Sequence, residues 1–247
     1  DRVLIKTVFN EQDEANFVVS SIMMDYNRGR NWKENAVLYR MNAQSHQIEQ
    51  AFKRNGIPYK IFGGTGFFGR AEIKDMLAYL CVIASPDDDL RLGRIINNPP
   101  RGIGAKSIET ASAIAHENNC SLFSVISKAE LYPDLSRAAP RMLLFAGMIN
   151  ELASEKDELA PDLLYDQLVE RTGYLRMLEE KHTVEDDARA QNIRELKSSI
   201  ISYKGETDSP SLEGYLADVA LYTDMDNYDE DADCVVMMTM HSAKGLE

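Results

Sequence analysis

The spacing of apolar positions along the first 62 residues changes several times. Short apolar stretches at 3–9, 36–39 and 59–62 have the composition of strands, whereas 11–28 and 44–55 carry apolar side chains at helical spacing. Strands that alternate with helices in this way form parallel sheets with crossover helices. The opening segment therefore predicts an α/β half-domain.

Beyond residue 70 the apolar positions keep a helical spacing for roughly 150 residues. Helices are predicted at 72–84, 90–96, 106–116, 122–128, 141–154, 160–170, 188–203 and 212–223. A β-branched and Met-rich run at 235–240 then predicts a buried strand that leads into a polar loop. The sequence stops within this loop, so we expect it to be a piece of a larger protein.

Together these patterns predict an α/β fold with a parallel sheet, interrupted by a large all-α insertion and mostly helical overall. We expect the first part of the α/β domain at residues 1–70 and the helical insertion at 71–225. Residues 226–247 would return to the sheet through an acidic linker, a strand and a loop.

The net charge of −13 argues against general affinity for nucleic acids, but the charge is unevenly distributed. Residues 36–110 carry 10 basic and 7 acidic side chains, a balance of +3, whereas residues 111–247 carry 12 and 27, a balance of −15. A contact with a polyanion is therefore expected in the 36–110 segment or at Lys244. The acidic helices are better suited to protein partners.

Three cysteines, Cys81, Cys120 and Cys234, lie far apart without the spacing of metal ligands. We interpret them as buried reduced thiols of a cytoplasmic protein and expect no metal site. The sequence has no signal peptide and no apolar run of membrane-spanning length, so no membrane partner is expected.

A glycine-rich stretch at 64–69 matches G-x-G-x-x-G and also has the glycine spacing of a P-loop. However, Arg and Ala follow it where a P-loop needs Lys and Ser or Thr, and two phenylalanines would crowd a pyrophosphate. We interpret the stretch as a tight strand-to-helix turn that packs Phe67 and Phe68 between the two blocks. An enzyme that binds NAD or ATP through these glycines is the less favoured interpretation.

A second glycine turn, Gly102-Ile103-Gly104, joins two predicted helices in the net-basic segment. The helix that follows offers free backbone N–H groups and a positive dipole end, which can hold a phosphate of a DNA backbone. The candidate residues for contact with duplex DNA are Arg101, Gly102, Ile103, Gly104, Lys106 and Ser107. An ordinary helical hairpin is the alternative, and the basic surroundings favour the DNA hypothesis.

Arg40 and Asn42 follow the predicted strand at 36–39, at the edge of an α/β sheet where ligands bind. Arg40 could hold a phosphate, whereas Asn42 could either bind a phosphate or cap the next helix. Adjacent Ser and His rarely form a catalytic triad, so the loop with His241 and Lys244 is expected to face a phosphate backbone. A charged surface turn is the alternative for this loop.

Four stretches, in this order and spacing, resemble the UvrD/PcrA/Rep type of superfamily 1 DNA helicases, and the PcrA members most of all. They lie at 36–45, 63–75, 101–104 and 238–247. The resemblance implies two RecA-like domains, of the P-loop NTPase type, that clamp ATP and Mg²⁺ and each carry a helical insertion. The chain would comprise part of the second RecA-like domain (2A), its helical insertion (2B) and the motif V loop.

The resemblance also implies roles for single residues. Arg40, Asn42 and His241 would contact single-stranded DNA, the Gly-Ile-Gly turn and Ser107 would lie on the duplex ahead of the fork, and Glu247 would reach the ribose of the nucleotide. Ser107 stands where the family usually has threonine, which keeps the hydroxyl. The implied partners are 3′-tailed duplex and single-stranded DNA, the first RecA-like domain of the same protein, and repair or polymerase proteins on the acidic helices.

The sequence contains neither G-x-x-x-x-G-K-[S/T] nor an Asp-Glu pair after an apolar strand. We therefore expect no catalytic residue here, and no ATP or Mg²⁺ binding, ATP hydrolysis or unwinding by this chain alone. The intact protein would be an ATP-dependent 3′–5′ helicase of DNA repair or replication, in the bacterial cytoplasm at the nucleoid. The alternative is an acidic helical interaction module that contacts DNA only incidentally.

Overall fold

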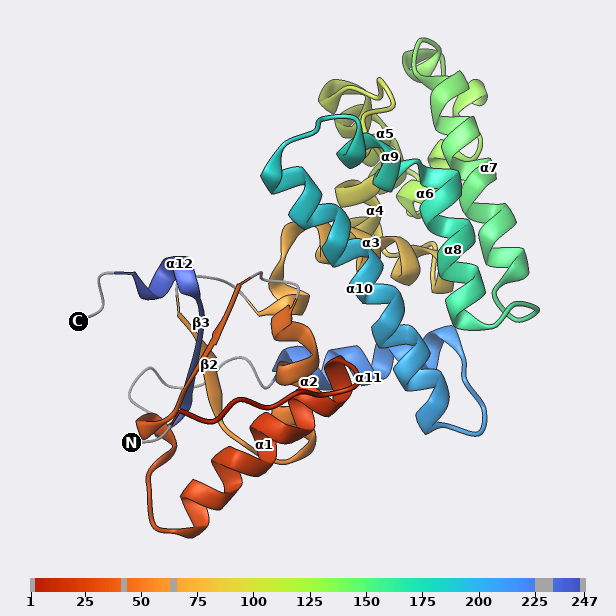
Figure 1. The fold of residues 1–247 in the computed structure, drawn as a ribbon. Helices are drawn as coiled ribbons and strands as arrows, with labels where there is room; N and C mark the ends of the chain where they lie inside the picture. Colours follow the sequence, from red (N-terminus) through yellow and green to blue (C-terminus); the bar gives the residue numbers. More distant parts are fainter. Residues whose placement is uncertain (1–2, 41–43, 63–65, 225–232, 245–247) are drawn as a thin grey trace. The chain divides into compact units, whose positions relative to one another are not determined.

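The computed structural model describes residues 3–40, 44–62, 66–224 and 233–244, with the backbone alone at 221–224 and at His241. Two compact units divide the chain: Asp1–Arg70 with Ala220–Glu247, and Ala71–Val219. Helices make up most of the described structure, and its one parallel sheet belongs to the first unit (Figure 1). The predicted mixture of a small parallel sheet and many helices is therefore confirmed.

The sheet of the first unit has three parallel strands in the order β1-β3-β2. They are β1 (Ala36–Tyr39), β2 (Tyr59–Ile61) and β3 (Val235–Thr239). The last strand in the sequence is thus the middle strand in space, which suits its buried, β-branched and Met-rich side chains. Segments 200 residues apart in the sequence must meet before this sheet exists, as the pairing of Ala36 with Val236 shows.

Two helices, α1 (Glu11–Asn27) and α2 (Ser45–Arg54), pack against the sheet. Their apolar residues form one core with strand residues, and Phe52 is fully buried in it. Asn10 caps α1, because its side chain accepts a hydrogen bond from the N–H of Asp13 at 2.8 Å. Gly56, with a φ of +65°, follows the end of α2.

Asp233 connects the beginning of this unit to the segment that returns to the sheet. Its two carboxylate oxygens accept hydrogen bonds from the N–H groups of Trp32 (3.2 Å) and Lys33 (2.8 Å) in the short helix η1 (Trp32–Glu34). The Trp32 ring stacks on Tyr26, with 3.9 Å between the ring centroids. The only tryptophan of the chain therefore reports on the folding of the first unit.

The second unit is built around α3 (Ala71–Ala84), which is buried on most of its surface. Around it lie α4 (Asp89–Ile95), α5 (Ala105–Glu117), α6 (Leu122–Ile126), α7 (Ala139–Glu155), α8 (Pro161–Thr172), α9 (Tyr174–Glu179) and α10 (Val184–Glu206). The chain also forms α11 (Leu212–Asp224), α12 (Met240–Ala243), η3 (Phe67–Gly69), η4 (Ala129–Leu131) and η5 (Pro133–Leu135). The unit ends at Val219, within α11, whereas the sequence predicted an end at residue 225.

Two predictions about the termini of the first unit were wrong. Residues 3–9 do not form a strand, and Val3 and Phe9 are 91% and 99% exposed. A strand needs a neighbour for its backbone groups, and no described residue pairs with this segment. After β3 the chain forms the helical turn α12 instead of a loop, and the hydroxyl of Thr239 accepts a hydrogen bond from the N–H of Ser242 at 3.1 Å.

The helical unit also departs from the prediction at three places. The short helix α9 was not predicted, and α10 begins at Val184, four residues earlier than expected, because Thr183 caps it. Cys120 is exposed, while Cys81 is half-buried and Cys234 is buried. The exposure of Cys120 follows from its position in the turn after α5, where the left-handed Asn119 (φ +48°) ends the helix.

A buried polar network fixes η3, the described part of the glycine-rich stretch, onto α2. Arg70 donates from Nη2 to the Ser45 hydroxyl (2.8 Å), which in turn donates to Oε1 of Glu49 (2.6 Å). The other carboxylate oxygen of Glu49 accepts the N–H of Phe67 at 3.1 Å. Arg70 is thus linked through Ser45 to the buried Glu49 carboxyl group, which favours a structural turn over a phosphate-binding loop.

His46 is fully buried beside this network, and its ring lies on Phe67 with 3.8 Å between centroids. Neither ring nitrogen has a hydrogen-bond partner within the part of the chain that the structure describes. Burial, followed by the positive charge of Arg70, lowers the pKa of His46 from 6.5 to about 3. The imidazole is therefore neutral in the folded protein across the physiological range.

We predict that His46→Gln reduces the loss of stability in mild acid. Below pH 6.5 the unfolded chain binds a proton at His46 that the folded chain binds only near pH 3. The His46-linked part of the free energy of unfolding is therefore fully present above pH 6.5. It falls toward pH 3, by up to about 1.4 kcal/mol per pH unit. Urea unfolding followed by Trp32 fluorescence at several pH values measures this loss.

The exposed His116 provides the control, because His116→Gln should retain the full acid sensitivity. Burial raises the pKa of Glu49, so protonation of Glu49 favours the folded state as the pH falls. This effect opposes that of His46 and is common to the original chain and both variants. Equal losses of stability in the original chain and in His46→Gln would contradict the assignment.

Candidate nucleic-acid interface

The carboxyl edge of the parallel sheet brings together two of the predicted contacts with single-stranded DNA. Tyr39 of β1 pairs with Thr239 of β3, so the residues that follow both strands lie at the same edge. These residues are the exposed Arg40 after β1 and His241, within α12, after β3. Segments about 200 residues apart in sequence thus meet where ligands bind in α/β folds.

The remaining predicted residues at this edge are only partly described. Asn42 and Glu247 lie outside the described residues, as does the side chain of His241. Lys244, directly after α12, is exposed. The described part of the edge therefore presents Arg40 and Lys244 as positively charged side chains that can reach a phosphate.

The Gly-Ile-Gly turn of the second unit is shaped by Asn97. Its side-chain Oδ1 accepts hydrogen bonds from the N–H groups of Arg101 (2.8 Å) and Ile103 (3.1 Å). Between them Gly102 has a φ of +70°, which is accessible to glycine without strain. Ile103 is fully buried and anchors the turn in the core. The turn thus has a defined shape that a ligand need not induce.

The Arg101 side chain points into the unit. Nη1 donates to the carbonyls of Ile95 (3.0 Å) and Pro99 (3.2 Å), and Nη2 donates to the Tyr79 hydroxyl (2.6 Å). The guanidinium carbon also lies 5.0 Å from the centroid of the Phe145 ring. This geometry makes Arg101 a positioning residue of the turn, and its predicted contact with duplex DNA remains a prediction.

The helix after the turn, α5, begins directly beyond Gly104, its N-cap residue. The Gly104 carbonyl accepts the N–H of Ser107 at 2.9 Å, and Lys106 is exposed. The N–H groups of Ala105 and Lys106 have no acceptor among the described residues. The first turn of α5 therefore offers free donors and one lysine at the positive end of a helix.

The segment before the turn is fixed by Asp75 of α3, which is only 5% exposed. Oδ1 accepts from Nε of Arg94, and Oδ2 accepts from Nδ2 of Asn98 and from the Tyr174 hydroxyl, each at 2.6 Å. The three donors come from α4, from the loop before the turn and from α9. One carboxylate thus joins three segments behind the turn.

Tyr79, one turn further along α3, supplies the second anchor. Its hydroxyl donates to the carbonyl of Asn98 (2.6 Å) and accepts from Arg101. Burial raises the pKa of Tyr79 to about 12, and burial and the carboxylate of Asp75 raise the pKa of Tyr174. Both hydroxyls therefore remain protonated donors at neutral pH.

Four residues of this network were not predicted from the sequence: Asp75, Tyr79, Asn97 and Tyr174. The available signal was weak: Asp75 and Tyr79 lie on a helix whose second half is otherwise apolar, but Glu72 and Lys74 make its first half look like an ordinary charged helix start. Buried polar groups in such a position are normally hydrogen-bonded, but the sequence does not reveal their partners.

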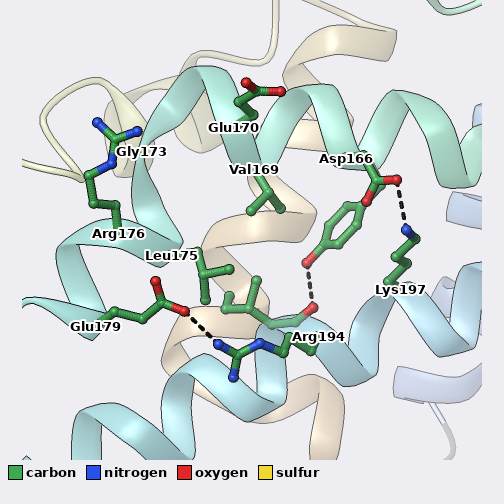
Figure 2. Close-up of a pocket in the computed structure, with 11 residues that line it drawn as sticks. Asp166, Val169, Glu170, Gly173, Leu175, Arg176, Glu179, Arg194 and Lys197 are labelled. Atoms are coloured by element: carbon green, nitrogen blue, oxygen red, sulfur yellow. Dashed lines mark hydrogen bonds and ion pairs between the residues drawn. The ribbon is translucent and has the colours of Figure 1, made fainter. Parts of the chain in front are cut away.

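A pocket of about 370 Å³ lies elsewhere in this unit, between α8, α9 and α10 (Figure 2). Val169, Leu175 and Ile193 provide its apolar lining. Two ion pairs between helices border it: Arg194 Nη2 with Glu179 Oε1 at 2.5 Å, and Lys197 Nζ with Asp166 Oδ2 at 2.7 Å. Glu170 and Arg176 also line the pocket, and the apolar side chains between these charged groups suit an apolar group of a ligand.

The described residues provide neither a metal site nor a membrane-spanning helix. No cluster of three or more His, Cys, Asp or Glu side chains there could hold a metal ion. None of the described helices is both long enough and apolar enough to cross a bilayer.

All 247 residues match the family model of the UvrD-like helicase C-terminal domain. The chain belongs to this family. It is similar to the ATP-dependent DNA helicase PcrA of Staphylococcus aureus, with 39% identity over 239 residues, 96% of this chain and 33% of the relative. It is also similar to PcrA of Staphylococcus epidermidis, with 38% identity over 249 residues, 100% of this chain and 34% of the relative.

The chain thus spans about a third of the length of the curated relatives it matches. Its membership among the UvrD-like helicase C-terminal domains confirms the resemblance inferred from four short motifs. The roles of individual residues in DNA or nucleotide binding remain predictions.

We predict that Tyr174→Phe destabilises the helical unit, because the buried Asp75 carboxylate loses one of its three donors. The expected loss is about 1–3 kcal/mol in the free energy of unfolding. Urea unfolding followed by circular dichroism measures it. The matched control is Tyr132→Phe, since the half-buried Tyr132 hydroxyl has no hydrogen-bond partner within the described chain. Equal effects of both variants would contradict the central position of Asp75.

Proposed function

We propose that this chain supplies DNA contacts to an ATP-dependent 3′–5′ DNA helicase that acts in DNA repair or replication. The first unit would be part of the second RecA-like domain, 2A, and the helical unit its insertion, 2B. Family membership and relatives named as ATP-dependent DNA helicases support this proposal. The observation that carries it is the pre-shaped turn at Gly102, with Lys106 exposed beside it.

In this proposal the turn binds the backbone of duplex DNA ahead of the fork. The free N–H groups in the first turn of α5, the Lys106 ammonium and the Ser107 hydroxyl would all address phosphate oxygens. Such contacts carry no base information, so binding should not depend on sequence. Gly102, Ile103 and Gly104 shape the turn, and Arg101 holds it from inside.

Single-stranded DNA would run along the carboxyl edge of the sheet, where Arg40, Asn42 and His241 would contact it. Arg40 and His241 follow two strands paired in register, which supports their use in one track. Alternating grips by the two RecA-like domains would then move the protein along the strand. Glu247 would reach the ribose of ATP.

ATP and Mg²⁺ would be held mainly by the first RecA-like domain of the same protein. This chain contains no G-x-x-x-x-G-K-[S/T] sequence, and Arg70 of the other glycine-rich stretch is hydrogen-bonded to Ser45. The intact helicase would act in the bacterial cytoplasm, at the nucleoid.

A second candidate function is an acidic helical module that binds protein partners, such as repair or polymerase proteins, with DNA contact only incidental. The balance of −15 over residues 111–247 and the apolar pocket between α8, α9 and α10 favour it. A partner would insert an apolar side chain beside Leu175. The two functions predict different surfaces and can be separated by mutation.

We predict that Lys106→Ala weakens binding to 3′-tailed duplex DNA several-fold at low salt. Losing one phosphate contact should also reduce the dependence of log K on log salt by about one. Fluorescence anisotropy of labelled DNA across a salt series measures both quantities. Arg101 is unsuited to this test, since its replacement would disrupt the turn itself.

The matched control is Lys156→Ala, at the C-terminal end of α7, where the ammonium pairs with Glu213 at 2.6 Å. It removes the same charge away from the turn and should leave the salt dependence unchanged. If Lys106→Ala behaves like this control, the duplex contact is refuted and the partner-binding function is favoured.

A further inference from the structure

An arginine from a distant part of the sequence lies against the Gly-Ile-Gly turn. Arg141, on α7, approaches Gly102 so closely that a Cβ at Gly102 would lie 3.1 Å from Nε and 3.5 Å from Cζ of the arginine. Gly102 therefore meets two requirements at once: a positive φ and room for the Arg141 side chain. The arginine head group sits directly beside the turn proposed to face DNA.

The position of Arg141 is set by the packing of α7. Phe145, one helical turn further along α7, lies beneath the guanidinium of Arg101 at 5.0 Å. Residues four apart share one face of a helix, so Arg141 and Phe145 meet two adjacent residues of the turn, Gly102 and Arg101. The arginine is therefore carried by a helix that is docked on the turn.

The positive charge of Arg141 is not paired with an acidic side chain among the described residues. Arg141 is exposed and forms no ion pair with any described residue. In this it differs from Arg101, which is committed to internal carbonyls and the Tyr79 hydroxyl. Lys106 is likewise exposed, without an ion pair among the described residues. Two exposed cationic side chains, one on α5 and one on α7, thus lie beside the same turn.

Arg141 is also placed against the electrostatic preference of its own helix. It lies in the first turn of α7, which contains no acidic residue. A cation at this end opposes the helix dipole and is unfavourable for the helix. Violations of local preference that have no structural compensation are typical of functional positions.

We infer that Arg141 is a second cation for the phosphodiester backbone of duplex DNA, acting together with Lys106 at the turn. This inference rests on the proposed function and extends the contact from α5 to α7. The ligand chemistry is a phosphate of double-stranded DNA, bound without regard to base sequence. Arg141 lies outside residues 36–110, the segment in which the sequence predicted the basic surface, so it was not among the predicted contacts.

The test uses this chain and a fluorescent 3′-tailed duplex, with anisotropy measured across a salt series. Arg141→Ala should weaken binding about fivefold at low salt and reduce the salt dependence of log K by about one. Arg141→Lys keeps the charge and should retain most of the salt dependence. The double variant Lys106→Ala/Arg141→Ala should lose about two units of salt dependence. Thermal unfolding confirms that each variant is folded.

The control is Lys156→Ala, which lies 15 residues from Arg141, or about 22 Å along α7, beyond the screening length of about 10 Å at 0.1 M salt. If Lys106→Ala reduces the salt dependence and Arg141→Ala does not, the inference is wrong and the proposed function stands. If neither variant differs from the control, or the chain does not bind the duplex, both the proposed function and the inference are refuted.

Discussion

The carboxylate of Asp75 is buried in the helical unit and accepts hydrogen bonds from Arg94, Asn98 and Tyr174. A buried charge is costly unless it is paired and hydrogen-bonded, so α3, α4, α9 and the loop before the turn stabilise each other. The carbonyl of Asn98 also accepts a hydrogen bond from the Tyr79 hydroxyl. The same hydroxyl accepts one from Arg101 and so holds its side chain in place. The shape of the Gly-Ile-Gly turn therefore depends on a network on its inner side, while its outer side remains free for a ligand.

The same unit combines two chemically different surfaces. Exposed cations of α5 and α7 lie beside the turn, whereas residues 111–247 carry a balance of −15. The apolar pocket lies between α8, α9 and α10 (Figure 2). Tyr174, between the pocket residues Gly173 and Leu175, reaches Asp75 with its hydroxyl. DNA binding and partner binding are thus compatible within one small domain, because a net charge of −13 does not prevent a local cationic site.

Periodicity in the sequence predicted most helices and the three strands, because long amphipathic segments carry a strong signal. It failed where the outcome depends on tertiary partners. Residues 3–9 are β-branched but have no neighbouring strand among the described residues, and α9 has only six residues. The Gly-Ile-Gly motif was recognisable from sequence, but the inward direction of Arg101 was not, since Tyr79 and Phe145 come from helices elsewhere in the chain.

The most direct test of this account is hydrogen–deuterium exchange of the chain with and without a 3′-tailed duplex. Exchange reports the protection of individual backbone segments, and therefore separates the two surfaces without any mutation. The duplex should protect residues 97–107 and the first turn of α7, with no change over residues 161–206. Protection confined to residues 161–206, with none at the turn, would contradict it.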